Sequence, residues 1–234
     1  AYGEPFDRAH AKLSFADQLI TLQPVDVLAG DARLSASGTY THPRETLATG
    51  HLQFTVSTND VSLAQFKTLQ KQHPGFSGLA NLNANIAADV LQTTPANASP
   101  SSQLAVRAIE LNLSAKNLRD DATKYGDLTA SAHTSAGTVT YAVDSNLAGS
   151  STSVRASTHL TPNYPTTLNA KTQSLQIEKA LMLAGKSALP VQGVLTAQVH
   201  LDGPIRDPAG TLSLDLTKAV VYDEPIDQLT GRVE

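Results

Sequence analysis

The feature of this sequence that most restricts its fold is a period-two alternation of apolar and polar residues. Leu52, Phe54 and Val56 alternate with Gln53 and Thr55. Successive side chains of a β-strand point to opposite faces, so such a run predicts a strand with one apolar and one polar face. The same pattern returns at 82–88, 109–113, 139–143, 195–201 and 212–216. The sequence therefore predicts an all-β protein built from one-sided strands.

Short turn signals separate the alternating runs. Ala29-Gly30-Asp31, Ser135-Ala136-Gly137 and Asp202-Gly203-Pro204 combine residue types that favour tight turns between strands. Such turns can join antiparallel strands, whereas parallel strands need long crossover connections. We therefore predict an antiparallel meander that continues through residues 1–234 as one β domain.

Two stretches change from the strand period to a helical one. Within 61–69, apolar residues fall at Leu63, Phe66 and Leu69, and Pro74 follows. The stretch 175–183 is apolar at similar spacing and precedes a glycine. Both stretches predict short helices, because proline and glycine commonly end a helix. The segment 92–102, rich in small and polar residues, predicts a mobile loop.

Composition limits the partners and the chemistry. Aromatic residues make up 5% of the chain and Trp is absent, so the apolar content is mainly Ala, Leu and Val. The net charge is −4 with no basic block, which disfavours nucleic acid as a partner. The absence of cysteine excludes disulfides and thiolate metal sites. No run approaches the ~18 apolar residues of a membrane-spanning helix, and no signal peptide opens the chain, so we expect a piece of a longer protein.

Catalytic and ligand-binding motifs are weak. The 7 histidines never occur at the i, i+2 or i, i+4 spacing that places two imidazoles on one metal ion. Gly185-Lys186-Ser187 resembles the end of a phosphate-binding loop, but it follows a predicted helix rather than a strand. Asp120-Asp121 and Asp223-Glu224 are neighbours, so on a strand their side chains would point to opposite faces. We therefore expect no catalytic residue, no metal, no cofactor and no enzymatic activity.

The sequence also contains internal repetition. The segment Tyr2 to Asp7 resembles Tyr222 to Asp227, and Tyr125 to Leu128 is a weaker third copy. Gly78 and Gly193 each follow a predicted helix and open an alternating strand. We therefore predict degenerate repeats of about 100 residues, as in proteins that stack similar units. The approximate units are 1–124 and 125–221, with a third that starts at 222.

The C-terminal part carries a family resemblance. The run 193–214 (GVLTAQVHLDGPIRDPAGTLSL) is a glycine, an alternating strand, a Gly-Pro turn with a second proline, and another alternating strand. This block and its continuation at 222–231 resemble the recurring block of the AsmA/TamB family of bacterial envelope proteins, which includes inter-membrane lipid transport proteins and the translocation and assembly module. The stretch 78–90 resembles a degenerate copy that lacks the turn.

The resemblance implies both a fold and a role. The implied fold is a long curved antiparallel sheet that forms an open hydrophobic trough, a β-taco-like shape. The implied role is to convey phospholipid acyl chains between the inner and outer membranes, in the periplasm, as part of a protein anchored in the inner membrane. Outer-membrane assembly proteins are further implied partners. The residues that we expect to line the groove are Leu52, Phe54, Val56, Leu82, Ile86, Leu111, Leu113, Val139, Tyr141, Leu195, Val199, Leu212 and Leu214.

Alternation alone does not distinguish an open groove from a closed core, and other roles stay open. Exposed strand edges suit a platform that assists the assembly of outer-membrane proteins or autotransporters by strand addition. Open sheet ends also suit a dimer of two copies. A structural, adhesin-like β-repeat protein is a further alternative. A polysaccharide-active enzyme is disfavoured, because the chain lacks Trp and a spaced pair of carboxylates.

Overall fold

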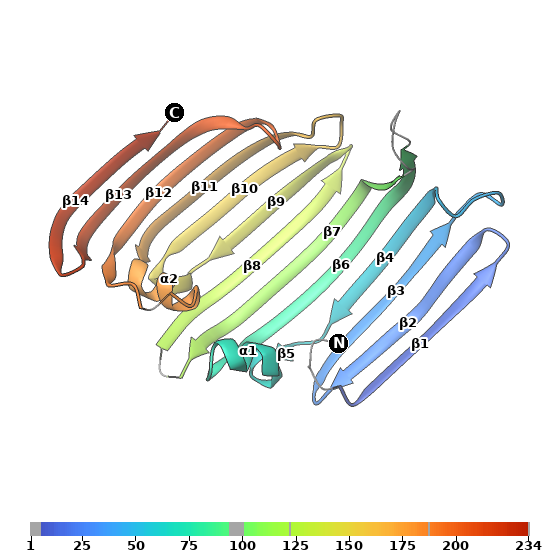
Figure 1. Cartoon of the computed structure of the whole chain (residues 1–234), viewed down its shortest axis with the longest axis horizontal. Helices are drawn as coiled ribbons and strands as arrows, with labels where there is room; N and C mark the ends of the chain where they lie inside the picture. The colour runs from blue at the N-terminus through green and yellow to red at the C-terminus, as the bar shows by residue number, and fades with distance from the viewer. Residues whose placement is uncertain (1–5, 94–100, 122, 187, 234) are drawn as a thin grey trace.

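The computed structural model describes residues 6–93, 101–121, 123–186 and 188–233, and it is all-β. A single sheet of 14 strands contains every strand of this part of the chain (Figure 1). The strands are β1 (Arg8–Ala16), β2 (Leu19–Ala29), β3 (Ala32–Thr41), β4 (Gly50–Thr58), β5 (Val61–Ser62), β6 (Phe76–Thr93), β7 (Ser101–Asp120), β8 (Thr123–Ser135), β9 (Thr138–Ser145), β10 (Ser151–His159), β11 (Pro165–Gln176), β12 (Val191–Pro204), β13 (Ala209–Val221) and β14 (Glu224–Val233). The predicted fold class is confirmed.

The topology of the sheet is a meander. Each long strand pairs antiparallel with the next long strand in the chain, and the two-residue β5 pairs with β6 beside this path. Within the described part of the chain the sheet stays open, because β1 and β14 each pair on one side only. Figure 1 shows a curved sheet in which the helical segments lie together at one end of the strands. Short turns between antiparallel strands produce this arrangement, as the sequence predicts.

The helical segments differ in their limits from the prediction. The stretch 61–69 divides into β5, a 3-10 helix (Leu63–Gln65) and α1 (Lys67–Gln72), because Phe66 is extended, with φ −80° and ψ 110°. The helix α2 (Ile177–Leu183) begins later than predicted, because Leu175 still pairs with Leu195 on β12. A second 3-10 helix (Leu147–Gly149) joins β9 to β10.

The predicted mobile loop at 92–102 needs a correction at both ends. Residues 92 and 93 pair with 102 and 101 as the last rungs of β6 and β7, so they are strand. The remaining core of that prediction, 94–100, lies outside the described residues. The strands extend farther than composition suggested, since a neighbouring strand can hold polar residues in a ladder despite their low strand propensity.

The repeats of about 100 residues are not visible as repeated units of the sheet, and they stay a prediction. The local pattern after each helix does recur: Gly78 and Gly193 have φ values of 146° and 147°, and both lie at a register shift. A Cβ atom on Gly78 would lie 2.9 Å from the backbone carbonyl oxygen of Lys116, so a side chain would not fit there. The three similar segments that begin with tyrosine differ in structure. Tyr125 is buried within β8 whereas Tyr222 is exposed in a turn, and Tyr2 lies outside the described residues.

The sheet forms one layer, and it buries little. The accessible surface is 14776 Å² for a chain of 24.6 kDa, whereas a compact monomer of this mass exposes roughly 10,000 Å². Among the described residues, the buried hydrophobic positions are mostly alanines, and Val139 is the largest side chain that is fully buried. No second sheet covers either face of this part of the chain.

Candidate functional site

Apolar rows cross the sheet from strand to strand. Opposed residues on neighbouring strands point to the same face, so the register defines each row. The first row runs from β2 to β13 through Val25, Ala36, Val56, Ala84, Leu111, Ala132, Tyr141, Ala156, Leu168, Leu201 and Gly210. At ~4.8 Å between neighbouring strands, this row is roughly 48 Å long.

A second row lies beside the first and continues to the far edge strand. Its members are Leu82, Leu113, Ala130, Val143, Val154, Ala170, Val199, Leu212 and Val233, which lead from β6 to β14. Neither row contains a charged residue. We call the side of the sheet that carries both rows the apolar face, and the other side the polar face.

All the residues predicted to line a groove lie on the apolar face. Each belongs to one of the two rows or stands an even number of residues away on the same strand, as Leu52 and Phe54 do from Val56. Most of them are half-buried. Val139 is the exception, since its relative exposure is 0%. The side chains around Val139 therefore cover it, and they form the accessible surface at this place.

Hydroxyl groups interrupt the apolar face, but their polar atoms are paired within it. Thr152 and Thr172 lie opposite each other on β10 and β11, with their hydroxyl oxygens 2.7 Å apart. Thr158 and Thr166 form the same kind of pair at 2.9 Å. The Thr134 hydroxyl donates to the carbonyl of Ile109 at 3.1 Å. Because these hydroxyls bond one another or the backbone, the apolar face needs few hydrogen bonds from a ligand.

The helical segments lie at one end of the strands and border the apolar face there. Figure 1 shows α1 and α2 at the same end of the strands, and α2 packs mainly on β12. A Cβ atom on Gly185, just after α2, would lie 3.7 Å from Cε1 of His73, just after α1. The ends of the two helices therefore meet, although six strand steps separate β6 from β12. The described connections at the opposite end of the strands contain no helix.

The polar face carries the ion pairs of neighbouring strands. Asp89 accepts from His51 Nδ1 at 2.6 Å and also pairs with Arg107. These bonds, that of His51 first, hold the pKa of Asp89 below its ordinary value of 3.8. The Thr167 hydroxyl, which donates to the carboxylate of Asp202 at 2.6 Å, is the main cause of a lowered pKa there.

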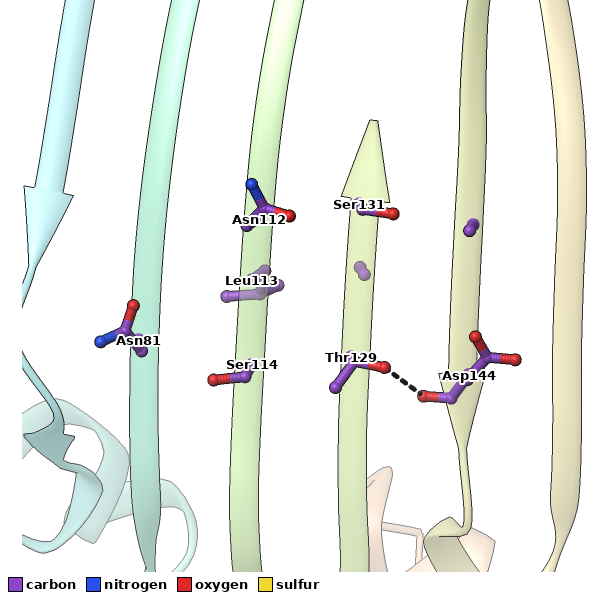
Figure 2. A pocket seen from close by; sticks show the side chains of 9 residues that line it. Asn81, Asn112, Leu113, Ser114, Thr129, Ser131 and Asp144 are labelled. Carbon is purple, nitrogen blue, oxygen red and sulfur yellow. Dashed lines mark hydrogen bonds between the residues drawn. The ribbon is translucent and has the colours of Figure 1, made fainter. Parts of the chain in front are cut away.

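A shallow hollow of about 340 Å³ lies on the polar face across β6, β7, β8 and β9. Figure 2 shows its small polar lining, which includes Asn81, Asn112, Ser114 and Ser131. Asp144 is its charged residue, and Arg155 neutralises Asp144 with two bonds of 2.8 and 2.9 Å. The hollow exists because serine and alanine leave space between longer neighbours.

Three further observations concern metal binding, membrane-spanning helices and the end of α2. Among the described residues, no three His, Asp or Glu side chains gather where they could hold a metal ion. No helix of that part of the chain is both long and apolar enough to cross a membrane. Gly185 has φ 67° and donates its N–H to the carbonyl of Met182 at 3.0 Å, so the predicted helix end is confirmed.

Sequence reasoning missed several strands of the apolar face. Val25 and Ala36 on β2 and β3, and Val154 and Leu168 on β10 and β11, belong to its rows. Threonine, serine and alanine dilute the alternation on these strands, so hydropathy alone does not reveal it. The turn signals on either side of β10, around Gly149 and Pro162, were the available indication of a strand between them.

Comparison with models of known protein families, with curated proteins and with solved structures finds no match for this chain.

Proposed function

We propose that the apolar face binds the acyl chains of phospholipids and conveys them along the sheet. The observation that carries this proposal is the pair of uncharged rows, half-buried and without a covering layer among the described residues. Monomeric soluble proteins rarely leave an apolar patch of more than a few hundred Å² exposed without a use for it. A hydrocarbon ligand would supply the missing cover.

The chemistry of the apolar face suits sliding better than fixed binding. Burial of a methylene group is worth ~0.8 kcal/mol and has no preferred direction. The threonine hydroxyls on this face are already hydrogen-bonded to one another or to the backbone, so they hold a passing chain at no particular register. A bound acyl chain could therefore move from strand to strand without breaking a polar contact.

The proposed setting comes from the resemblance of 193–214 and 222–231 to the AsmA/TamB family. In that setting the chain is a periplasmic segment of a protein anchored in the inner membrane, and its apolar face spans part of the path to the outer membrane. The direction of transport and the lipid headgroup do not enter the proposal, because the apolar face recognises only the tails.

Site-specific photo-crosslinking in membranes tests this function. A photo-reactive amino acid is placed at Phe54, Tyr141 or Val199 on the apolar face, and at the outward neighbours Gln53, Thr140 or Gln198 as matched controls. We expect labelled phospholipid to crosslink to the first set and not to the second. Equal labelling of both sets, or none at the first, would contradict the proposal. Native mass spectrometry of the purified chain gives an independent readout of co-purified lipid.

A second function is favoured by the two open edges. Among the described residues, strands β1 and β14 pair on one side only, so each offers unpaired backbone groups to an added strand. A platform for nascent outer-membrane strands would co-purify with unfolded porin-like chains and would tolerate Val199→Asp or Leu214→Glu. The acyl-chain conduit should fail with both substitutions, so this pair of variants separates the two functions.

A further inference from the structure

A small apolar pocket lies at one end of the apolar face, under the segment that joins β4 to β6. Its floor is formed by Val27, Leu34 and Thr58 on three neighbouring strands, and its wall by Val61 and Phe66. Its volume is about 260 Å³. An engineered apolar cavity of ~150 Å³ holds benzene, whereas pockets for drug-sized ligands measure ~300–1,000 Å³. The pocket therefore suits a short hydrocarbon end rather than a whole amphiphile.

The polar groups around this pocket are directed elsewhere. The guanidinium of Arg33 bonds Asp26 on the polar face at 3.0 and 3.2 Å. The side-chain oxygen of Gln65 lies against Gly30, 3.0 Å from where a Cβ atom would stand. The Thr58 hydroxyl accepts from the N–H of Leu82 at 2.9 Å. A polar ligand would therefore find few partners in the pocket, and an apolar one would lose few hydrogen bonds.

The pocket is continuous with the first apolar row. Val27 and Leu34 oppose each other, and each stands two residues from a member of that row, Val25 and Ala36. Leu34 is 38% exposed and the nearby Phe6 is 53% exposed, so large apolar side chains around the pocket lack full cover. Val61, at 7% exposure, closes the inner end. A chain that lies on the row can reach the pocket without crossing polar surface.

We infer that this pocket receives the methyl end of an acyl chain whose remaining methylenes lie on the apolar rows. This inference rests on the proposed function and adds a place where the chain stops. An acyl chain that slides along the rows has no preferred register. The wall of Val61 and Phe66 blocks its further movement toward the end of the strands where the helices lie. The pocket thereby sets the orientation of the tail, with the methyl group inward and the headgroup toward the open part of the face.

Two diazirine-labelled palmitic acids test the inference. One carries the photo-reactive group at the terminal carbon and the other in the middle of the chain. We expect the terminal probe to label the peptides that contain Leu34 and Val61–Phe66, and the middle probe to label strands farther along the rows. Leu34→Asp places a charge in the pocket and should lower terminal-probe labelling there at least about tenfold. Ser37→Asp, on the polar face of the same strand and opposite the uncharged Thr55, is the matched control and should change nothing.

A second variant, Val61→Trp, fills the pocket without adding charge and should give the same loss, with folding checked by circular dichroism. The inference is overturned if terminal-probe labels spread evenly along the rows, or if both variants label like the wild type while the middle probe still binds. In that case the proposed function survives. If neither probe labels the apolar face, the proposed function fails, and the pocket inference fails with it.

Discussion

The two faces of this sheet share one backbone and differ in how they satisfy their side chains. On the polar face, neighbouring strands exchange hydrogen bonds and ion pairs, such as Arg155 with Asp144 and His51 with Asp89. On the apolar face, side chains meet in rows and remain half-buried, because no second layer covers the described part of the sheet. The polar groups of the polar face satisfy one another or bond water. The apolar side chains of the other face are buried only when a ligand or a partner covers them, and their exposure to water costs free energy.

This difference shows that an alternating sequence determines which side chains share a face, but does not determine whether that face is buried in a core. In a sandwich, the same rows would pack against a second sheet and become fully buried. Here Val139 alone reaches full burial among the large side chains that the structure describes. Stability must then come from cross-strand neighbours within one layer, at ~0.2–1 kcal/mol for each favourable pair.

The largest expected effect is at Val139, the point where the apolar face has a true core. Val139→Asp buries a charge without a partner and should lower the free energy of unfolding by at least ~3 kcal/mol. The adjacent Thr140 lies on the polar face and is exposed, so Thr140→Asp should stay within about 0.5 kcal/mol. Urea unfolding followed by circular dichroism measures both. Equal losses would mean that the two faces are not distinct at this strand.

The next effect concerns ligand binding on the half-buried rows. Val199→Asp should weaken the binding of palmitate at least about tenfold, since the charge must be desolvated under an acyl chain. The polar-face neighbour Gln198→Asp should leave binding unchanged. Displacement of a fluorescent fatty acid measures the affinity. If both variants bind like the wild type, the rows are not the lipid surface, and the comparison of the faces loses its functional meaning.

A smaller effect separates the two threonines of one hydroxyl pair. Thr158 is 4% exposed and bonds Thr166, which also donates to the carbonyl of Tyr164 at 3.0 Å. Thr166→Val leaves the buried Thr158 hydroxyl without this partner, so it should cost ~1–2 kcal/mol. Thr158→Val should cost less, because Thr166 keeps its bond to Tyr164.

The double variant completes this test. With both hydroxyls removed, its stability should be close to that of Thr158→Val alone, since two apolar side chains of similar shape replace the pair. Thermal unfolding of the four proteins gives the coupling. Additive losses of stability would show that the two hydroxyls act independently. The threonine hydroxyls of the apolar face would then not satisfy one another as described.

The sequence predicts the strands better than it predicts the surface that they make. Alternation identifies β4, β7, β12 and β13 correctly, because apolar residues, mostly leucine, isoleucine and valine, occupy every second position of their alternating runs. It does not reveal β10, because Thr152 and Thr158 take two of the positions on the apolar face. Nor can periodicity decide whether a row is open or closed, because that depends on a second layer rather than on the strand itself. The pocket under β5 requires residues from four separate segments, which no local pattern brings together.

The pH dependence of stability tests the polar face. Bonds from His51 and Arg107 lower the pKa of Asp89, so its folded carboxyl is more acidic than the ordinary 3.8 of an unfolded chain. Its contribution is therefore complete above the unfolded pKa and is lost as the pH falls through the lower, folded pKa. We expect acidification below about pH 4 to destabilise the wild type more than Asp89→Asn. Parallel pH profiles of the two proteins would contradict this assignment.

The smallest expected effect is at the ion pair of Arg155 and Asp144, beside the hollow of Figure 2. Both side chains are more than half exposed, at 54% and 55%, so water already screens their attraction. Asp144→Ser should cost no more than ~1 kcal/mol despite the two short bonds, and high salt should reduce the difference further. Urea unfolding at low and high ionic strength measures it. A large loss that salt leaves unchanged would mean that the polar face is held together as tightly as the apolar one.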